Sequence, residues 1–381
     1  MTVHGNVSMF LPRVKPEHMP YRLDDGRVRI GGVLYGIAAE IEDPNGSVWT
    51  LLESMDGSRT PDEVVARVLH FHPRESEEEI YSGLESLCSS GYAEDIGSPD
   101  PAELSEREKA RYSNSRAYFR WLDQVQRGST WEPQIALRNS RVTIVGLGGT
   151  GGNAALALAA SGVGKLHCVD SDRVELSNLN RQIIYDESAV GQSKVDSAIR
   201  KLRALNSDVD VTGTQQYIKN VEDLIPFAED SDAILMAADR PSEIRSWANR
   251  ACLATKTPWV ESGYHGPLVT IGTYVPGEGA CWECLRTAQR EQHNQLYSKV
   301  HDAAHRGEAV GGNAVAAPSA GLSGYLAAHA VLGLLTGIAP APTGCIYAFN
   351  LFALNEPYIF DSVPSDICPD CGRSGSSDRK E

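Results

Sequence analysis

The stretch RVTIVGLGGTGG, residues 141–152 of this 381-residue chain, constrains the fold more than any other feature of the sequence. A β-branched apolar run leads directly into glycines, and a helix-forming run, NAALALAASG, follows them. This order of strand, glycine turn and helix lets backbone N–H groups and the helix N-terminus approach phosphates. The sequence therefore predicts a nucleotide-binding α/β domain, in which the candidate phosphate-binding glycines are Gly146, Gly148, Gly149 and Gly151.

A second apolar run, KLHCVD, ends in Asp170, 24 residues after Gly146. A doubly wound fold places a carboxylate at this position, where it binds the ribose hydroxyls of a nucleotide. Up to this point an NAD enzyme would fit equally well. The polar run that follows the strand, SDRVELSNLNRQ, adds three candidates for nucleotide binding, which are Asp172, Asn178 and Gln182.

Two cations favour ATP over a dinucleotide. Arg181 and Lys194 lie thirteen residues apart after the second strand, and Lys194 comes early in an expected helix. Cations aimed at a site that already has a phosphate turn indicate a longer phosphate chain than a pyrophosphate bridge. The alternative is that both are solvated surface charges, which would be the default for either residue taken singly.

Asp239 ends another apolar strand, AILMAAD. Open α/β sheets bind ligands at the carboxyl ends of their strands, and a carboxylate there can hold the Mg²⁺ that ATP brings. The alternative is that Asp239 only caps the helix that the run PSEIRSWANRACLA predicts.

Together, GLGGTG, DSDRVELSNLNRQ, GQSK and Asp239 resemble the motifs of the ThiF/MoeB superfamily of ATP-dependent adenylyltransferases, which includes ubiquitin-activating enzymes. The resemblance covers about residues 108–372. It implies that Asp170 binds the ribose and that Asp239 holds or neighbours the magnesium. It also implies that two cations bind the phosphates and two amides order the turn beside them, namely Arg181 and Lys194, and Asn178 and Gln182.

Within this superfamily, residues 236–284 are most similar to the microcin C-type peptide adenylyltransferases. Members of that family are homodimers in which an arginine reaches across the interface from a segment written RYSRN or similar. The segment here reads RYSNSRAYF, so Asn114 takes the usual arginine position. Arg116 is the nearest substitute and Arg111 is another. We expect Arg116 to act across the interface and to complete the catalytic set, with Arg181, Lys194 and Asp239.

Four of the eight cysteines form two CxxC pairs, CWEC and CPDC. Paired thiolates at this spacing are ligands for a tetrahedral zinc site with no open position for chemistry, and the family resemblance also implies a structural zinc. Free or disulfide-linked thiols are the alternative. The predicted zinc ligands are Cys281, Cys284, Cys368 and Cys371.

The other four cysteines are poor candidates for a nucleophile. An enzyme that passes an activated acyl group to a thiol needs an exposed, reactive cysteine. Three of the four lie in apolar runs and one in the N-terminal region, and the segment expected to cross over the active site, residues 286–318, contains none. We therefore expect adenylation without a covalent thioester.

The first hundred residues predict a small winged-helix-like unit. Residues 28–42 mix β-branched and aromatic residues with glycine, as short paired strands do, and three helices and a short strand follow. One helix starts with Thr60 as N-cap and Pro61 at its first position. Winged helices often bind DNA, but the second and third helices here are acidic, which disfavours that role.

The stretch WTLLESMDGSRTPDEVVARV resembles the PqqD-like recognition elements of enzymes that modify ribosomal peptides. The resemblance covers roughly residues 25–96. It implies that the leader of a precursor peptide docks as an added strand on an exposed sheet edge. The alternative is a small domain that only pads a dimer.

Composition sets the expected domain bounds and surroundings. A polar segment near residues 93–135 predicts a linker and a dimer-associated helix, which gives four parts: 1–100, 101–135, 136–372 and a disordered tail at 373–381. The net charge of -15 disfavours nucleic acid and anionic membrane as partners. The N-terminus lacks the apolar core of a secretory signal, so we expect a cytoplasmic protein.

The sequence therefore predicts a Rossmann-like doubly wound α/β domain with an ATP site and a zinc clip, preceded by a small α+β peptide-binding domain. The expected reaction is magnesium-dependent adenylation of the C-terminal carboxylate of a ribosomal precursor peptide, in natural-product biosynthesis. In the resembled family a C-terminal asparagine is processed onward to a phosphoramidate, a step that nothing in this sequence shows. Two rivals stay open: activation of a Gly-Gly sulfur-carrier protein, and a non-catalytic peptide-binding scaffold.

Overall fold

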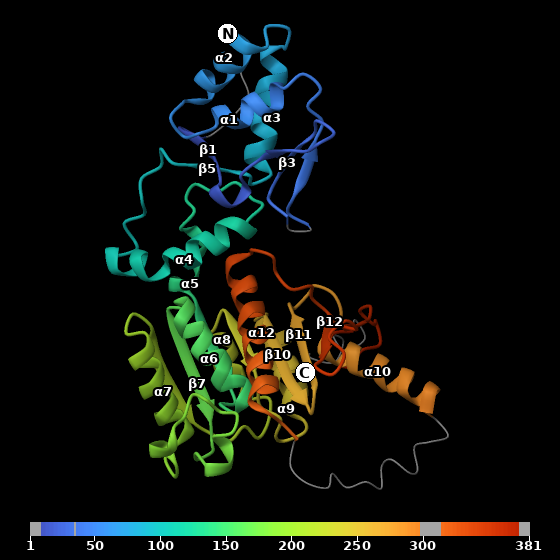
Figure 1. Ribbon diagram of the computed structural model, residues 1–381. Helices are drawn as coiled ribbons and strands as arrows, with labels where there is room; N and C mark the ends of the chain where they lie inside the picture. The colour runs from blue at the N-terminus through green and yellow to red at the C-terminus, as the bar shows by residue number, and fades with distance from the viewer. Residues whose placement is uncertain (1–8, 34–35, 298–313, 373–381) are drawn as a thin grey trace, which may run out of the picture. The chain divides into compact units, whose positions relative to one another are not determined.

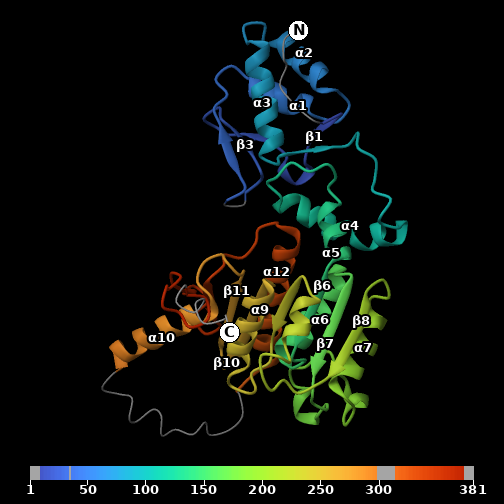
Figure 2. The same cartoon turned by 180° about the vertical axis from the view of Figure 1, so that it is seen from behind.

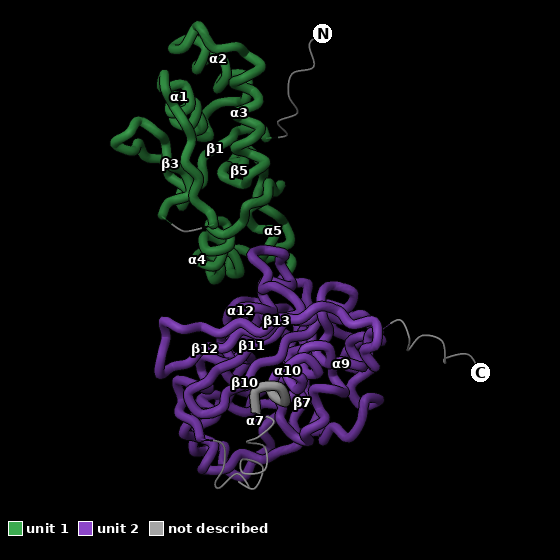
Figure 3. The backbone as a smooth tube through the Cα atoms, turned by 90° about the vertical axis from the view of Figure 1, so that its right-hand side faces the viewer, with its two compact units in different colours: residues 1–136 green, residues 137–381 purple. Residues whose placement is uncertain are grey.

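The computed structural model (Figure 1) describes three stretches of the chain, residues 9–33, 36–297 and 314–372. The predicted disordered tail therefore lies outside the described residues. The chain divides into two compact units, unit 1 with residues 1–136 and unit 2 with residues 137–381 (Figure 3). This division falls beside the predicted start of the nucleotide-binding domain at residue 136, whereas the bound between residues 100 and 101 stays a prediction.

Unit 1 has a helical core beside two short sheets. Helices α1, α2 and α3 pack around fully buried apolar side chains, among them Val64, Val68 and Leu84. Helix α2 begins as the sequence predicts, since the Thr60 side chain accepts a hydrogen bond from the N–H of Glu63. The elements are β1 Pro12–Val14, η1 Pro16–His18, β2 Tyr21–Arg22, β3 Val28–Ile30, β4 Ala39–Ile41, α1 Ser47–Ser54, α2 Pro61–Phe71, α3 Glu77–Ser89, β5 Ala93–Asp95 and α4 Glu106–Leu122. Helix α5, Glu132–Asn139, spans the boundary between the two units.

The strands of unit 1 form two antiparallel sheets. One has the order β2-β3-β4, so that β2 and β4 are its edges among the described residues. The other pairs β1 with β5 and places Val14 opposite Ala93. The strand in YAEDI therefore joins the N-terminal strand and does not extend the three-stranded sheet.

Unit 2 is an α/β fold around one eight-stranded sheet. Its central strands are buried because helices cover both faces of the sheet: every residue of β9 (Ala233–Met236) is buried, and so is every residue of β6 (Arg141–Val145) after Arg141. The elements are β6 Arg141–Val145, α6 Gly149–Ser161, β7 Lys165–Asp170, η2 Leu176–Asn178, η3 Glu187–Ala189, α7 Lys194–Leu205, β8 Asp210–Gln215, α8 Ile225–Glu229, β9 Ala233–Met236, α9 Ile244–Thr255, β10 Trp259–His265, β11 Leu268–Tyr274, α10 Trp282–Tyr297, α12 Ala317–Thr336, β12 Cys345–Asn350 and β13 Tyr358–Asp361.

The sheet has the order β13-β12-β11-β10-β9-β6-β7-β8. Strands β10, β9, β6, β7 and β8 run parallel, and β11, β12 and β13 continue the sheet antiparallel. The chain leaves β6 for β7 and β8 on one side and then returns to β9 on the other. A ligand crevice is expected at such a reversal of strand order, outside the carboxyl ends of the strands. The Rossmann-like class predicted from the sequence is confirmed, with a mixed sheet.

Helices cover both faces of this sheet (Figures 1 and 2). Helices α6, α7 and α12 lie on one face, and α8, α9 and α10 lie on the other. Helix α12 has the length and apolar composition of a membrane-spanning helix. It packs against α6 and β10, and 56% of the 18-residue apolar stretch within this helix is buried inside the structure. A core helix passes the same test of length and composition, so this feature alone does not indicate a membrane span.

Candidate active site

A cavity of about 700 Å³ opens at the carboxyl ends of the central strands. Its walls come from five neighbouring strands and the segments that follow them, in the order β8, β7, β6, β9 and β10. The cavity thus lies where the strand order reverses. The predicted site residues that line it are Gly146, Gly148, Gly149, Asp170, Asp172, Asn178, Arg181, Gln182, Lys194 and Asp239.

The glycine turn after β6 brings the chain backbone close to the cavity. Gly146 has a φ of +92°, and a Cβ there would lie 2.6 Å from the backbone nitrogen of Ala238. Helix α6 then begins at Gly149, and its N-cap Gly148 has no side chain to satisfy the first N–H groups. These N–H groups are available to an anion, as in other phosphate-binding helix N-termini.

Gly151 differs from the other three glycines because it does not line the cavity. A Cβ at this position would lie 1.8 Å from the carbonyl oxygen of Gly146. The role of Gly151 is therefore structural: because it has no side chain, helix α6 can pack directly on the glycine turn.

We expect Gly151→Ala to cost about 3 kcal/mol of unfolding free energy, because the added methyl group overpacks the contact with Gly146. Calorimetry should also show ATP affinity reduced by about 10-fold, since the displaced N–H groups at the start of α6 no longer point at the phosphates. The matched control is Gly321→Ala in α12, where the nearest atom to the new Cβ is 4.0 Å away. That variant should be neutral or slightly stabilising, and equal effects of the two substitutions would contradict the steric argument.

Asp170 ties the glycine turn to the end of β7. One carboxylate oxygen accepts a hydrogen bond of 2.6 Å from the N–H of Leu147, and the other accepts one of 2.8 Å from the N–H of Asp172. A carboxylate offers about four lone-pair directions. Asp170 therefore fixes the turn and still has capacity for the ribose hydroxyls that the sequence predicts it to bind.

Lys194 is the first residue of α7 and is held beside the cavity by Asp172. Its Nζ lies 2.9 Å from a carboxylate oxygen of Asp172, and its backbone N–H donates to the Asp172 carbonyl oxygen. The lysine side chain is 7% exposed, whereas that of Asp172 is 64% exposed. Asp172, which the sequence predicts to be a nucleotide ligand, is thus placed to orient the lysine.

Arg181 and Gln182 each leave a buried polar atom without a hydrogen-bond partner among the described residues. Arg181 donates from Nη1 to the Ser177 carbonyl and the Asn180 side chain, but its Nε is unpaired. The unpaired atom of Gln182 is Oε1. An unpaired buried polar group costs roughly 1–3 kcal/mol, so both atoms fit a site that a polar ligand completes. A guanidinium N–H at this place suits a phosphate oxygen.

Asp239 is exposed and has no hydrogen bond or ion pair with any described residue. Helix α9 begins at Ile244, with Glu243 as its N-cap and no side-chain cap hydrogen bond. Asp239 therefore does not cap this helix, and the alternative that it serves only as a helix cap is excluded. Its carboxylate lines the cavity next to Ala238, the residue against which the glycine turn packs, and this position fits a magnesium ligand.

Asn178 and Arg116 have different surroundings. The Asn178 side chain accepts a hydrogen bond of 3.1 Å from the N–H of Glu175 and so orders the turn after β7. Arg116 lies in unit 1, where its Nε donates to Thr130 and its guanidinium lies 4.7 Å from the ring centre of Trp131. The predicted action of Arg116 across a dimer interface stays a prediction.

The cavity also contains residues that the sequence did not single out. Arg245 and the residues Ser262, Gly263 and Tyr264 of β10 line its far wall, and Tyr217 follows β8 at the other end. Arg245 lies six residues after Asp239, so a search for cations near strand-end carboxylates could have found it. The β10 residues have no comparable local signal, because only the pairing of β10 with β9 brings them here.

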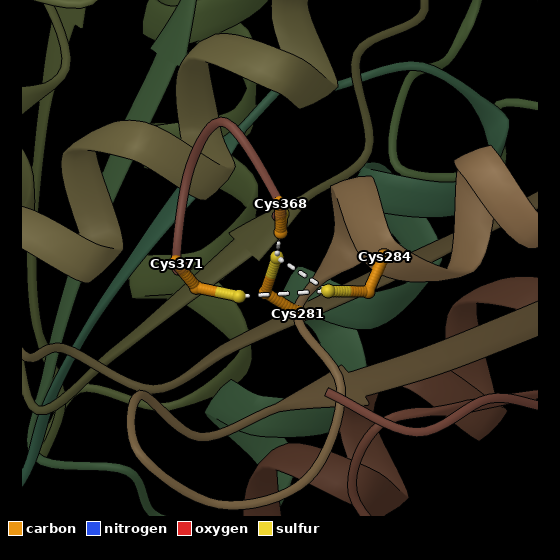
Figure 4. Close-up of side chains that lie close together, drawn as sticks. All are labelled: Cys281, Cys284, Cys368 and Cys371. Carbon is orange, nitrogen blue, oxygen red and sulfur yellow. Dashed lines mark hydrogen bonds between the residues drawn. The ribbon is translucent and has the colours of Figure 1, made fainter. Parts of the chain in front are cut away.

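The four predicted zinc ligands come together in one cluster (Figure 4). The Sγ atoms of Cys281 and Cys284 are 3.8 Å apart, those of Cys281 and Cys368 are 3.7 Å apart, and those of Cys284 and Cys371 are 3.5 Å apart. Tetrahedral zinc with Zn–S bonds of about 2.3 Å requires sulfur separations of about 3.8 Å. A disulfide requires about 2.05 Å. The cluster is therefore consistent with zinc and not with disulfides.

The loop of the second cysteine pair is also bonded to helix α9. Asp370 accepts hydrogen bonds from the Asn249 side chain at 2.7 Å and from Arg250 Nε at 2.9 Å. The Asn249 side chain in turn accepts a hydrogen bond from the N–H of Trp282, which lies between Cys281 and Cys284 in the sequence. A metal at the cluster would thus join the C-terminal loop, the start of α10 and the helix that follows Asp239.

The remaining cysteines, Cys88, Cys168, Cys252 and Cys345, are all buried. Burial raises the pKa of Cys88 and of Cys168 to about 12, and it also raises the pKa of Cys252 and Cys345. These thiols stay protonated at neutral pH and are poor nucleophiles. Part of the predicted crossover segment, residues 298–313, lies outside the described residues.

The fold and the cavity define a nucleotide-binding α/β protein with its ligand site at the reversal of strand order. The model of the ThiF family matches residues 123–369. Molybdopterin-synthase adenylyltransferase of Escherichia coli K12 is 37% identical over 187 residues, which are 48% of this chain and 70% of that protein. The sulfur carrier protein ThiS adenylyltransferase of the same organism is 31% identical over 241 residues, 62% of this chain and 88% of that protein. The chain therefore belongs to the ThiF family and is an ATP-dependent adenylyltransferase.

Solved structures extend the likeness in fold to nearly the whole chain. A crystal structure of E. coli MccB matches with a TM-score of 0.76 and 20% identity, over 95% of this chain and 97% of that chain. The microcin C7 biosynthetic enzyme MccB in complex with N-formylated MccA matches with a TM-score of 0.72 and 21% identity, over 95% and 99%. PaaA matches with a TM-score of 0.66 and 24% identity, over 91% and 99%.

Proposed function

We propose that this enzyme adenylates the C-terminal carboxylate of a ribosomal precursor peptide whose leader binds to unit 1. The observation that carries the proposal is the difference in coverage. The family model begins at residue 123, and the two sulfur-carrier adenylyltransferases match 48% and 62% of this chain. The MccB structures match 95% of it. Unit 1 is therefore what separates this chain from enzymes that activate sulfur carriers.

Unit 1 has a surface that suits an extended peptide. Its three-stranded sheet ends in β4, a three-residue strand with no neighbour on its outer side among the described residues. An extended leader can add to such an edge through main-chain hydrogen bonds and gain specificity from side chains on either face. The helices that follow β4 are the elements of the predicted peptide-recognition unit, and the edge is where we place the leader.

The cavity supplies what carboxylate adenylation needs. Little covalent chemistry falls to the protein, which has to position the reactants and neutralise charge. Arg181, Lys194 and the N-terminus of α6 bind the phosphates, and Asp170 binds the ribose. Mg²⁺ at Asp239 would neutralise phosphate charge, and structural zinc would occupy the cysteine cluster. With buried thiols outside that cluster, the product leaves as an adenylate or goes on to a nucleotide-modified peptide.

The proposal includes the surroundings in which the enzyme works. We place it in the cytoplasm, where precursor peptides are made and thiolate zinc sites persist. We also infer a homodimer in which Arg116 reaches the cavity of the partner subunit, as the resemblance to the peptide adenylyltransferases implies.

Pyrophosphate release tests the proposed function directly. The substrate is a synthetic copy of a short precursor peptide, to be sought among the reading frames next to this chain's gene. With ATP, magnesium and this peptide, we expect the rate to rise about 100-fold over the rate without peptide. The same peptide with a C-terminal amide should give no increase, since it lacks the nucleophile. A peptide without its leader should react with a KM raised about 10- to 100-fold. Full activity of the leaderless peptide would contradict the role of unit 1.

A second candidate function is activation of a Gly-Gly sulfur-carrier protein, which the 37% and 31% identities to such adenylyltransferases favour. A carrier protein that ends in Gly-Gly is the discriminating substrate. Pyrophosphate release with this protein, and none with the peptide, would establish the second function in place of the first.

A further inference from the structure

Arg245 lies in the first turn of α9 and lines the cavity, yet the functions assigned above do not use it. We propose that Arg245 binds the carboxylate that becomes adenylated, an assignment that rests on the proposed function. An ion pair with Glu261 positions the guanidinium, and its terminal nitrogens are free to donate to a ligand. It lies on the opposite side of the glycine turn from the phosphate-binding cations.

An ion pair holds Arg245 against strand β10. Its Nε lies 3.0 Å from Oε2 of Glu261. Oε1 of Glu261 accepts a hydrogen bond of 2.8 Å from the hydroxyl of Tyr274, which is buried and stacks on Trp259. Burial and the neighbouring Glu261 carboxylate raise the pKa of Tyr274, so its hydroxyl stays a donor at neutral pH. This chain of contacts orients the guanidinium before any substrate binds.

None of the three side-chain nitrogens of Arg245 has a hydrogen-bond partner in the part of the chain that the structure describes, and the buried Nε has only its ion-pair contact with Glu261. A Cβ on Gly263 would lie 3.3 Å from Nη2, so the guanidinium lies close to a backbone that carries no side chain. The arginine side chain is 32% exposed, and Glu261 is 12% exposed. The free edge of the guanidinium is thus open to the cavity, and its parallel N–H groups match the two oxygens of a carboxylate.

Arg245 and the phosphate-binding cations reach the cavity from opposite sides. Arg181 and Lys194 follow β7, and Arg245 follows β9, while β6 and its glycine turn lie between these strands. In-line displacement puts the attacking oxygen and the leaving pyrophosphate on opposite sides of the α-phosphorus. With the pyrophosphate toward Arg181 and Lys194, the carboxylate approaches from β9 and β10, where Arg245 lies.

The step needs no proton transfer. A carboxylate oxygen forms a bond to the α-phosphorus, and the bond from that phosphorus to the oxygen bridging to the β-phosphorus breaks. The electron pair of the broken bond leaves with pyrophosphate. The approach is opposed because carboxylate and triphosphate are both anions. Arg245 offsets that repulsion and directs one carboxylate oxygen at the phosphorus, and Glu261 keeps the guanidinium from moving onto the phosphates.

The comparison of a peptide acid with its amide tests this assignment. The probe is the synthetic precursor peptide used in the pyrophosphate test above, with either a free C-terminal carboxylate or a C-terminal primary amide. In the presence of magnesium and a non-hydrolysable ATP analogue, calorimetry should show that the wild type binds the acid about 30-fold more tightly, because the amide loses a charge-assisted pair. In Arg245→Gln this ratio should fall to about 1–3.

Two further variants separate binding from structure. Glu261→Gln keeps Arg245 but weakens its anchor, so the ratio of acid to amide affinity should fall only part of the way, to about 10. Arg240→Gln removes the other arginine near Asp239 and should leave the ratio unchanged. All three variants should bind ATP without peptide to within about 3-fold of the wild type, because the substitutions lie away from the phosphate cations.

The outcomes distinguish the two proposals. If the wild type releases no pyrophosphate with the peptide acid, the proposed function fails and the assignment of Arg245 fails with it. If the wild type is active and Arg245→Gln keeps the full acid preference, or if Arg240→Gln loses it instead, the assignment of Arg245 alone is overturned.

Discussion

Replacing Asp239 with asparagine is expected to lower kcat by about 100- to 1,000-fold and to change ATP affinity little. Asparagine keeps the shape of the side chain but removes the negative charge that a hard divalent cation prefers as a ligand. Because Asp239 makes no hydrogen bond with a described residue and does not cap α9, its loss should not disturb the fold. Pyrophosphate release at saturating ATP, magnesium and peptide measures kcat, and calorimetry measures the affinity for ATP.

The control for this variant is at the other end of the same strand. Asp232 precedes β9, and its carboxylate accepts a hydrogen bond of 2.8 Å from the N–H of Arg141, which the carbonyl of asparagine can also accept. Asp232→Asn should therefore keep kcat within about 2-fold. If the protein is a non-catalytic scaffold, neither the wild type nor the two variants will release pyrophosphate. If Asp239→Asn is as active as the wild type, the metal-binding role of this carboxylate is contradicted.

Local sequence patterns were sufficient to predict the elements around the phosphate site. The run that ends in Gly146 forms β6 because its β-branched residues suit a buried parallel strand, and helix α6 follows the glycines directly. The start of α7 at Lys194 and the capping box at Thr60 are likewise set within a few residues. Cysteine spacing identified both halves of the metal cluster for the same reason. Each of these features depends on neighbours in the sequence.

Features that depend on distant pairing could not be predicted. Strand β1 contains Pro12 and spans three residues, too few for an alternating pattern, and it forms only because Val14 pairs with Ala93. The ion pair of Arg245 with Glu261 exists because β10 lies parallel to β9 and places Glu261 opposite Met236. Nothing near Arg245 in the sequence indicates which strand lies beside it.

The contact between Lys194 and Asp172 shows a second limit. Both residues were candidates for nucleotide binding from the sequence, and the structure brings both to the cavity. Their mutual hydrogen bond assigns Asp172 a different task, that of orienting the lysine. Residue type and spacing indicate that a side chain belongs to a site, but whether it contacts the ligand or another side chain depends on the tertiary structure.

Replacing Cys284 with serine is expected to remove the metal and to lower the thermal midpoint of unit 2 by about 10 °C. Structural zinc contributes about 10–16 kcal/mol in small zinc-finger peptides. Even about 4 kcal/mol, in a unit of this size, shifts the midpoint by about 10 °C. The loss should be large here because the cluster joins two segments far apart in the sequence, residues 281–284 and 368–371. Metal content by atomic absorption should fall from one zinc per chain to none.

The effect of zinc loss should extend to the nucleotide site through helix α9. Asp370 holds Asn249 and Arg250 of that helix, which begins five residues after Asp239. Without the metal we expect ATP affinity to fall by about 10-fold, as when a supporting contact of a metal site is removed. Cys345→Ser is the matched control, because this buried thiol contacts the Pro342 carbonyl, to which a serine hydroxyl can also donate. If Cys284→Ser and Cys345→Ser lower the midpoint and the ATP affinity equally, the four-cysteine cluster does not brace the site.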